Sequence, residues 1–164
     1  MKAAADVIDI FLNPGDVFFG DSEMRLRTLL GSCVAITVWH PQRKIGGMCH
    51  YMLPARGRGE FKELDGRYAD EAILLLLKEI LRQQTNPYHY EVKLFGGGNM
   101  FLHVATKQKS RDLNVADRNV IAAQELLQRH GFAIAAEHLG GDGYRNVIFD
   151  IGSGDVWVKQ TPKK

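Results

Sequence analysis

The residues of this sequence that are best suited to chemistry are one cysteine and one histidine that a short hairpin would bring together. Residues 33–39 are rich in β-branched side chains, and residues 44–53 read as extended up to a proline, which predicts two strands joined by a polar turn. If the last residue of the first run faces the first residue of the second, Cys33 lies directly opposite His50. Directly opposed residues have Cβ atoms about 4.5–5.5 Å apart, so the thiol is expected within hydrogen-bonding reach of the imidazole.

A thiol beside an imidazole is the arrangement that nucleophilic catalysis needs. The imidazole removes the thiol proton to give a thiolate at neutral pH, and the imidazolium then protonates the leaving group. Gly31 and Ser32 stand directly before Cys33, where they allow a tight turn and present backbone amides that could stabilise a tetrahedral oxyanion. A second interpretation fits the same spacing, in which Cys33 is a small core residue and His50 a hydrogen-bonded strand residue.

The other cysteine, Cys49, is next to His50 in the same strand and so points to the opposite face. A metal site on Cys33, His50 and Cys49 would then have two ligands on one face, whereas zinc takes at least three from protein. A disulfide between the two cysteines is disfavoured by the same alternation and by a reducing compartment. We therefore expect a packing role for Cys49 and no bound metal.

The elements that must position the pair predict one mixed α/β domain over residues 1–164. A length of 164 residues fits a single core, and the near balance of 21 Lys and Arg against 19 Asp and Glu gives no basic footprint for nucleic acid. We expect helices over 68–83 and from the N-cap Asn114 to Arg129. Further strands are expected at 7–12, 17–19, 90–95 and 132–138, with a closing hairpin of 146–151 and 155–159.

Targeting signals are not visible in the sequence. The longest unbroken apolar run, 72–77, is far too short to insert into a membrane, and an aspartate interrupts the apolar stretch near the N-terminus. We therefore expect a cytoplasmic protein, whose cysteines stay reduced.

Two loops allow alternative interpretations. The triple glycine 96–98 lacks the lysine and hydroxyl residue of a phosphate-binding loop, so it predicts a tight turn that lets another segment or a substrate approach closely. The basic residues Arg56, Arg58, Lys62 and Arg67 are typical of a solvated loop, or of a surface that contacts an acidic partner helix.

Several blocks of this sequence together resemble the chemoreceptor glutamine deamidase (CheD) family, and they run in order through nearly the whole chain. They are LGSCV at 30–34, GGMCHYMLP at 46–54, YAD at 68–70, KLFGGGNMF at 93–101, RN at 118–119, GG at 140–141 with Arg145, and GDVWV at 154–158.

This resemblance implies an αββα sandwich of mixed and antiparallel sheets with outer helices, similar to the cytotoxic necrotising factor-like cysteine hydrolases. It implies hydrolytic deamidation of specific glutamine side chains on the cytoplasmic domains of methyl-accepting chemotaxis receptors, and in some members hydrolysis of glutamyl methyl esters. Cys33 matches the family's nucleophile and His50 its histidine. Thr28 is the nearest match to the family's third catalytic residue, a threonine, and no cofactor is implied.

A different class of function stays open from the sequence. The chain could be a catalytically weak binding module that regulates a chemotaxis phosphatase or a receptor through the same surface. Ammonia release that depends on Cys33 would separate the enzyme from the binding module.

Overall fold

The structure, a computed structural model, describes residues 6–57, 59–60, 63–100 and 113–162. Arg58 and Lys62 of the predicted basic loop, Phe101 of the resemblance and the two ends of the predicted domain lie outside the described residues. The strands are β1 (Ile8–Leu12), β2 (Val17–Gly20), β3 (Met24–Leu30), β4 (Val34–His40), β5 (Ile45–Tyr51), β6 (Glu91–Gly96), β7 (Ile134–Leu139), β8 (Tyr144–Asp150) and β9 (Val156–Thr161). The helices are α1 (Ala69–Arg82), the short 3-10 helix η2 (Pro87–His89) and α3 (Val115–Arg129).

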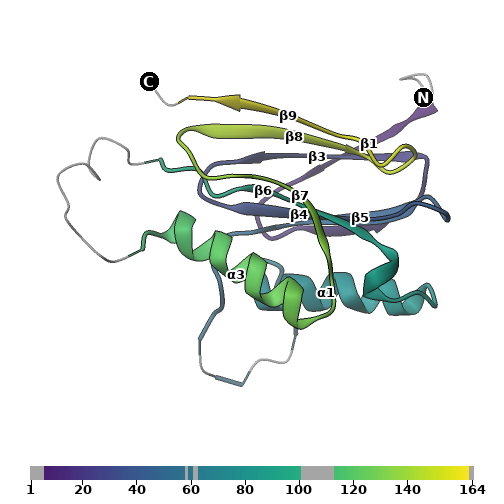
Figure 1. The fold of residues 1–164 in the computed structure, drawn as a ribbon, viewed down its shortest axis with the longest axis horizontal. Helices are drawn as coiled ribbons and strands as arrows, with labels where there is room; N and C mark the ends of the chain where they lie inside the picture. Colours follow the sequence, from purple (N-terminus) through teal and green to yellow (C-terminus); the bar gives the residue numbers. More distant parts are fainter. Residues whose placement is uncertain (1–5, 58, 61–62, 101–112, 163–164) are drawn as a thin grey trace.

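The strands form two sheets, a five-stranded one in the order β2-β5-β4-β6-β7 and a four-stranded one in the order β1-β3-β8-β9. The β1–β3 and β6–β7 pairs are parallel and the other pairs are antiparallel. Figure 1 shows the sheets stacked on one another with the α-helices outside. The predicted mixed α/β class, with two sheets and outer helices, is confirmed.

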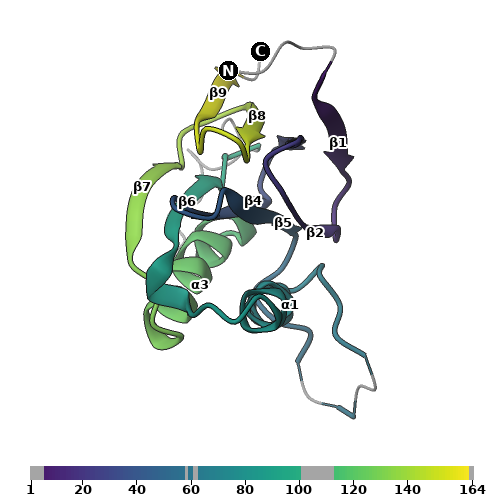
Figure 2. The ribbon, with the colours of Figure 1, turned by 90° about the vertical axis from the view of Figure 1, so that its right-hand side faces the viewer.

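Both α-helices pack on the same face of the five-stranded sheet, so the described layers follow the order helices, sheet, sheet (Figure 2). The second helix layer of the expected αββα order has no counterpart among the described residues. One apolar core lies between the helices and the five-stranded sheet, and a second lies between the two sheets. No helix in the described part of the chain covers the outer face of the four-stranded sheet, where Phe11, Leu29 and Trp157 are exposed. No helix in the described part of the chain is long and apolar enough to cross a membrane.

Local sequence explains where α3 begins. The side chain of Asn114 accepts a hydrogen bond from the Asp117 amide at 2.8 Å, which satisfies one of the free donors of the first turn and confirms the predicted N-cap. The buried side of the helix carries small residues, so the helix can approach the sheet closely. This approach brings α3 against the segment that contains Cys33.

The β4–β5 hairpin has a register two residues away from the predicted one. His50 is opposite Ala35, so the prediction that Cys33 lies directly opposite His50 is wrong. The turn occupies 41–44 and is closed by Lys44, whose φ of 55° lies in the left-handed region and whose amide donates to the His40 carbonyl at 3.0 Å. Each strand is therefore displaced by one residue, and a total shift of two leaves every side chain on its predicted face.

The triple glycine turn after β6 lies against the segment before β4, as its sequence predicts. Gly96 has a φ of 117°, and a Cβ atom there would lie 2.2 Å from the Cys33 carbonyl oxygen. Only glycine fits a position that is both left-handed and in such close contact. The turn can therefore support the Cys33 segment directly.

Candidate active site

Three of the side chains singled out in the sequence lie on the inner faces of the two sheets. Thr28 comes from the inner face of β3, His50 from the facing side of β5, and Cys33 from the segment just before β4. Thr28 Oγ1 is 2.7 Å from His50 Nδ1, and both residues are buried. Cys33 is half-buried and packs against the apolar core between the sheets, the side on which His50 meets Thr28.

The contact between Thr28 and His50 determines which imidazole nitrogen is basic. The Thr28 hydroxyl donates its single proton to the Leu12 carbonyl of β1, at 2.8 Å. It can then only accept from His50, so the imidazole proton sits on Nδ1 and Nε2 keeps its lone pair. Nε2 is buried and has no hydrogen-bond partner among the described residues, so the hydrogen bond between the Cys33 thiol and the imidazole that the sequence predicts is not formed. His50 is thus held with an unprotonated Nε2, the form of imidazole that can accept a proton.

Burial keeps the pair uncharged. It lowers the pKa of His50 to about 4, an effect that the carboxylate of Asp16 partly opposes. It also raises the pKa of the Cys33 thiol. Both shifts favour a thiol and a neutral imidazole over the standing thiolate expected from the sequence.

The carbonyls of three consecutive residues, Gly31 to Cys33, each accept a hydrogen bond. The Gly31 carbonyl accepts from the Gly98 amide and the Cys33 carbonyl from the Gly97 amide, both at 2.9 Å. The Ser32 carbonyl accepts from Asn119 Nδ2 of α3 at 3.1 Å. In a trans peptide the next amide points away from the carbonyl, so the amides of Ser32 and Cys33 are turned away from these partners.

A buried arginine, Arg145, donates hydrogen bonds to the glycine turn. Arg145 of β8 donates to the Gly96 carbonyl at 3.1 Å, to the Gly140 carbonyl at 2.5 Å and to His138 Nδ1 at 2.8 Å. Burial lowers the pKa of its guanidinium. The side chain therefore ties the turn after β6 to the end of β7, and its positive charge lies close to the segment that carries Cys33.

Cys49 occupies the opposite face of β5, as the alternation predicts. It is fully buried in the core beneath the α-helices, and burial raises the pKa of its thiol to about 12. Both cysteines are free. The structure does not bring Cys33, His50 and Cys49 together as a set of metal ligands, because the sheet separates Cys49 from the other two.

Comparison with known proteins gives the family. The model of the family described as CheD chemotactic sensory transduction matches residues 52–160. The chain belongs to the CheD family. A relative from Pseudomonas syringae pv. tomato, named a probable chemoreceptor glutamine deamidase CheD, is 51% identical over 162 residues, which cover 99% of this chain and 95% of that one.

More distant CheD proteins match over a similar length. Relatives with the same name from Dechloromonas aromatica and Leptospira interrogans are 46% and 36% identical and are covered to 89% and 93% of their own length. Among solved structures, the hypothetical protein YfiH of Bacillus licheniformis matches with a TM-score of 0.47 and 16% identity, over 75% of this chain and 49% of that protein. The recognised family and the enzyme class in the names of its members are those expected from the sequence.

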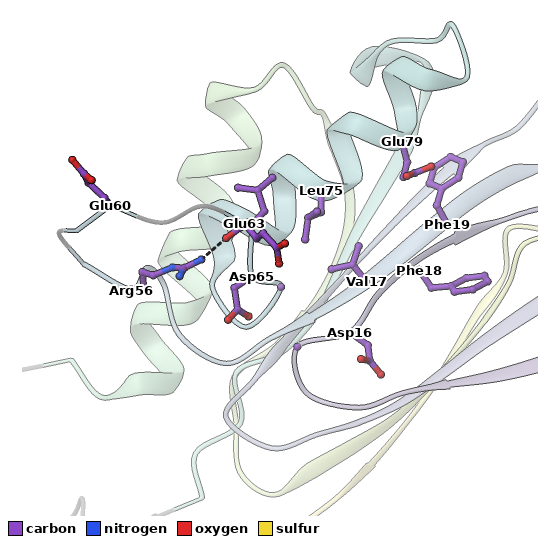
Figure 3. A pocket seen from close by; sticks show the side chains of 13 residues that line it. Asp16, Val17, Phe18, Phe19, Arg56, Glu60, Glu63, Asp65, Leu75 and Glu79 are labelled. Atoms are coloured by element: carbon purple, nitrogen blue, oxygen red, sulfur yellow. Dashed lines mark hydrogen bonds between the residues drawn. The ribbon is translucent and has the colours of Figure 1, made fainter.

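Two hollows border different parts of this CheD protein. The larger, of about 870 Å³, lies between β2, α1 and the loop before α1, and five of its lining residues are acidic (Figure 3). It contains none of Thr28, Cys33 and His50. A smaller hollow of about 390 Å³ begins at Ser32, the residue before Cys33, and continues along Gly98 to Met100 and the start of α3.

The described arginines of the predicted basic loop are paired within the chain. Arg56 donates to the Glu63 carbonyl (Figure 3). It also donates to both carboxylate oxygens of Glu71, and Arg67 forms an ion pair with Asp65 at 2.6 Å. Glu71 and Asp65 in turn have lowered pKa values, mainly because of hydrogen bonds from these arginines. The surface around this loop is therefore acidic where the structure describes it.

Asn119 and Arg145 support the site, although the sequence analysis assigned them no role. Each occupies a buried position in a regular apolar pattern, Asn119 on the inner side of α3 and Arg145 on the inner side of β8. A polar residue at such a position must find buried partners, because an unpaired buried polar group is costly. A polar residue at a buried position of an apolar pattern is therefore the sequence signal that could have identified Asn119 and Arg145.

Proposed function

We propose that this protein, as a single cytoplasmic domain, deamidates glutamine side chains of methyl-accepting chemotaxis receptors, with Cys33 as the nucleophile and His50 as the base. The observation that carries the proposal is the hydrogen-bond relay from the Leu12 carbonyl through Thr28 to His50 Nδ1. It leaves Nε2 unprotonated on the inter-sheet side, against which Cys33 packs. The names of the relatives supply the substrate class.

In the first half of the reaction, Nε2 of His50 takes the Cys33 proton as Sγ bonds to the carboxamide carbon. Because both groups start uncharged, proton transfer accompanies the attack instead of preceding it. The carbonyl oxygen becomes an oxyanion, which the Ser32 and Cys33 amides would stabilise, with Gly31 allowing the turn before them. When the carbon–nitrogen bond breaks, the imidazolium gives its proton to the leaving nitrogen, and ammonia departs from a thioester.

In the second half, water replaces ammonia. His50 Nε2 removes a proton from water as the oxygen bonds to the thioester carbon. The carbon–sulfur bond then breaks, and the imidazolium returns its proton to Sγ. The products are a glutamate side chain and ammonia. A glutamyl methyl ester would follow the same steps with methanol as the leaving group, and neither reaction requires a cofactor.

The smaller hollow borders the segment that carries the thiol, although Cys33 itself is not among its lining residues. Its walls are mainly apolar, and it begins at Ser32, next to the nucleophile. Thr28, on the far side of the imidazole, would orient His50 without touching the substrate.

The test is mass spectrometry of receptor cytoplasmic fragments incubated with the parent protein or with Cys33→Ala, together with an assay of released ammonia. We expect glutamine-to-glutamate conversion, a gain of about 1 Da, with the parent and a decrease on the order of 10³-fold or more in the variant. Equal, slow ammonia release by both proteins would favour a binding module that regulates a receptor or a phosphatase. A methylated fragment tests ester hydrolysis through methanol release.

A further inference from the structure

Asn119 is a polar residue in a place that packing alone would fill with an apolar one. It is completely buried on the inner side of α3, in line with Ala116, Ala123 and Leu127. Its Oδ1 has no hydrogen-bond partner among the described residues. A buried unpaired oxygen lowers stability, so what the asparagine contributes must come from the other half of its amide.

The Nδ2 group joins the two segments that carry the reacting side chains. It donates to the Ser32 carbonyl at 3.1 Å and to the Met52 carbonyl at 2.8 Å. Ser32 directly precedes Cys33, and Met52 follows His50 by two residues. Both partners are carbonyl oxygens, so only the nitrogen of the side-chain amide can face them. One side chain therefore fixes the separation of the nucleophile segment from the strand that bears the base.

The backbone of Asn119 is held as firmly as its side chain. The hydroxyl of Tyr51, fully buried at the end of β5, donates to the Asn119 carbonyl. Tyr51 is the direct neighbour of His50, so α3 is bonded to β5 just beyond the base. The position of the amide relative to the catalytic strand is thus set by two independent contacts.

We infer that Asn119 is a positioning residue for the oxyanion site. Its hydrogen bond to the Ser32 carbonyl fixes the peptide between Ser32 and Cys33, whose amide points the opposite way, toward the place where the substrate oxygen develops negative charge. The Gly97 and Gly98 amides fix the peptides on either side. This inference rests on the proposed function, because it assigns the Cys33 amide a role in glutamine deamidation.

The experiment separates carbonyl chemistry from thiol reactivity. Deamidation passes through an oxyanion, whereas alkylation of Cys33 by iodoacetamide displaces iodide at a saturated carbon and forms none. For Asn119→Ala we expect kcat for ammonia release from a receptor fragment to fall by about 10²-fold or more, with KM little changed. The alkylation rate of Cys33 should stay within about threefold of the parent rate.

Leu127→Ala is the matched control, since it removes buried side-chain contacts from the same side of α3 without touching the Cys33 segment. We expect it to retain kcat within about threefold. A parent-like kcat in folded Asn119→Ala, a parallel loss of alkylation, or an equal loss of kcat in Leu127→Ala would each overturn the inference. If Asn119→Ala does not fold, Tyr51→Phe replaces it, with a decrease in kcat of about three- to tenfold expected and a parent-like kcat overturning the inference.

If the proposed function itself is wrong, ammonia release gives a different result from the one expected when only the inference on Asn119 is wrong. In that case the parent and Cys33→Ala release ammonia at the same rate, and both proposals fall together. If the parent is active and Cys33→Ala is not, the proposed function stands and the Asn119 variants decide the inference alone.

Discussion

The two faces of the β4–β5 hairpin differ in composition although they alternate along the same strands. On the helix side, Ile36, Val38 and Cys49 are packed in an apolar core against the buried residues of both α-helices. On the side that faces the other sheet, His50 is buried beside Ala35 and Met48 and bonds to Thr28. The first face stabilises the sheet, whereas the second combines a core with a reactive site.

This contrast is clearest in the two cysteines. Cys49 is fully buried with a thiol pKa of about 12, while Cys33 is half-buried at the edge of the inter-sheet core. Cys49 is next to His50 in sequence but points to the opposite face of β5, whereas Cys33 is distant in sequence and lies on the same side as His50. Strand alternation therefore separates the two thiols.

The largest expected effect is the difference in alkylation between the two thiols. With iodoacetamide at pH 8, we expect Cys33 to be modified about 10³-fold faster than Cys49, because thiolate formation and access both favour it. Peptide mass spectrometry over a time course measures the two rates. In denaturant the rates should converge. Modification of Cys49 first, or of both equally in the folded protein, would contradict the assignment of faces.

The second prediction concerns the relay through Thr28. Thr28→Val keeps the shape but leaves Nδ1 of His50 without its acceptor, so the proton is no longer fixed there. We expect kcat for deamidation to fall by about 10- to 100-fold. Thr28→Ser, which keeps the hydroxyl, should retain most of the activity. An active Thr28→Val would show that strand packing alone orients the imidazole.

The third prediction is a pH effect on stability caused by the burial of His50. Because its pKa is lowered to about 4 in the folded protein, the unfolded chain binds a proton more readily between pH 6.5 and 4, and stability falls as the pH falls through that window. Between pH 7 and 4.5 the parent should lose about 2 kcal/mol more than His50→Gln. Urea unfolding at both pH values measures this difference. Equal losses would mean that the imidazole is not shielded.

Much of this arrangement follows from sequence because it depends on local patterns. Alternation put Cys33 and His50 on one face and Cys49 on the other, and the Asn114 cap and the turn at Gly96 were recognisable from residue type. The hairpin register was not, because it depends on the left-handed conformation of Lys44, which residue type does not favour.

Contacts between distant elements account for the remainder. The gathering of both helices in one layer, the uncharged state of the pair and the link from Asn119 to Ser32 all depend on how α3 and the two sheets pack. No pattern within a single element contains that information. A buried polar residue in an apolar stripe indicates that a partner exists, but it does not identify the partner.

The relay from Leu12 through Thr28 to His50 crosses from one sheet to the other, so it forms only when both sheets are packed together. During synthesis the hairpin with Cys33 and His50 emerges well before α3 and the strands β8 and β9, which complete the sheets. An unfinished chain would hold the thiol and the imidazole without the contacts that Thr28 and Asn119 make in the folded protein. If the proposed mechanism holds, folding is therefore the step that assembles the active site.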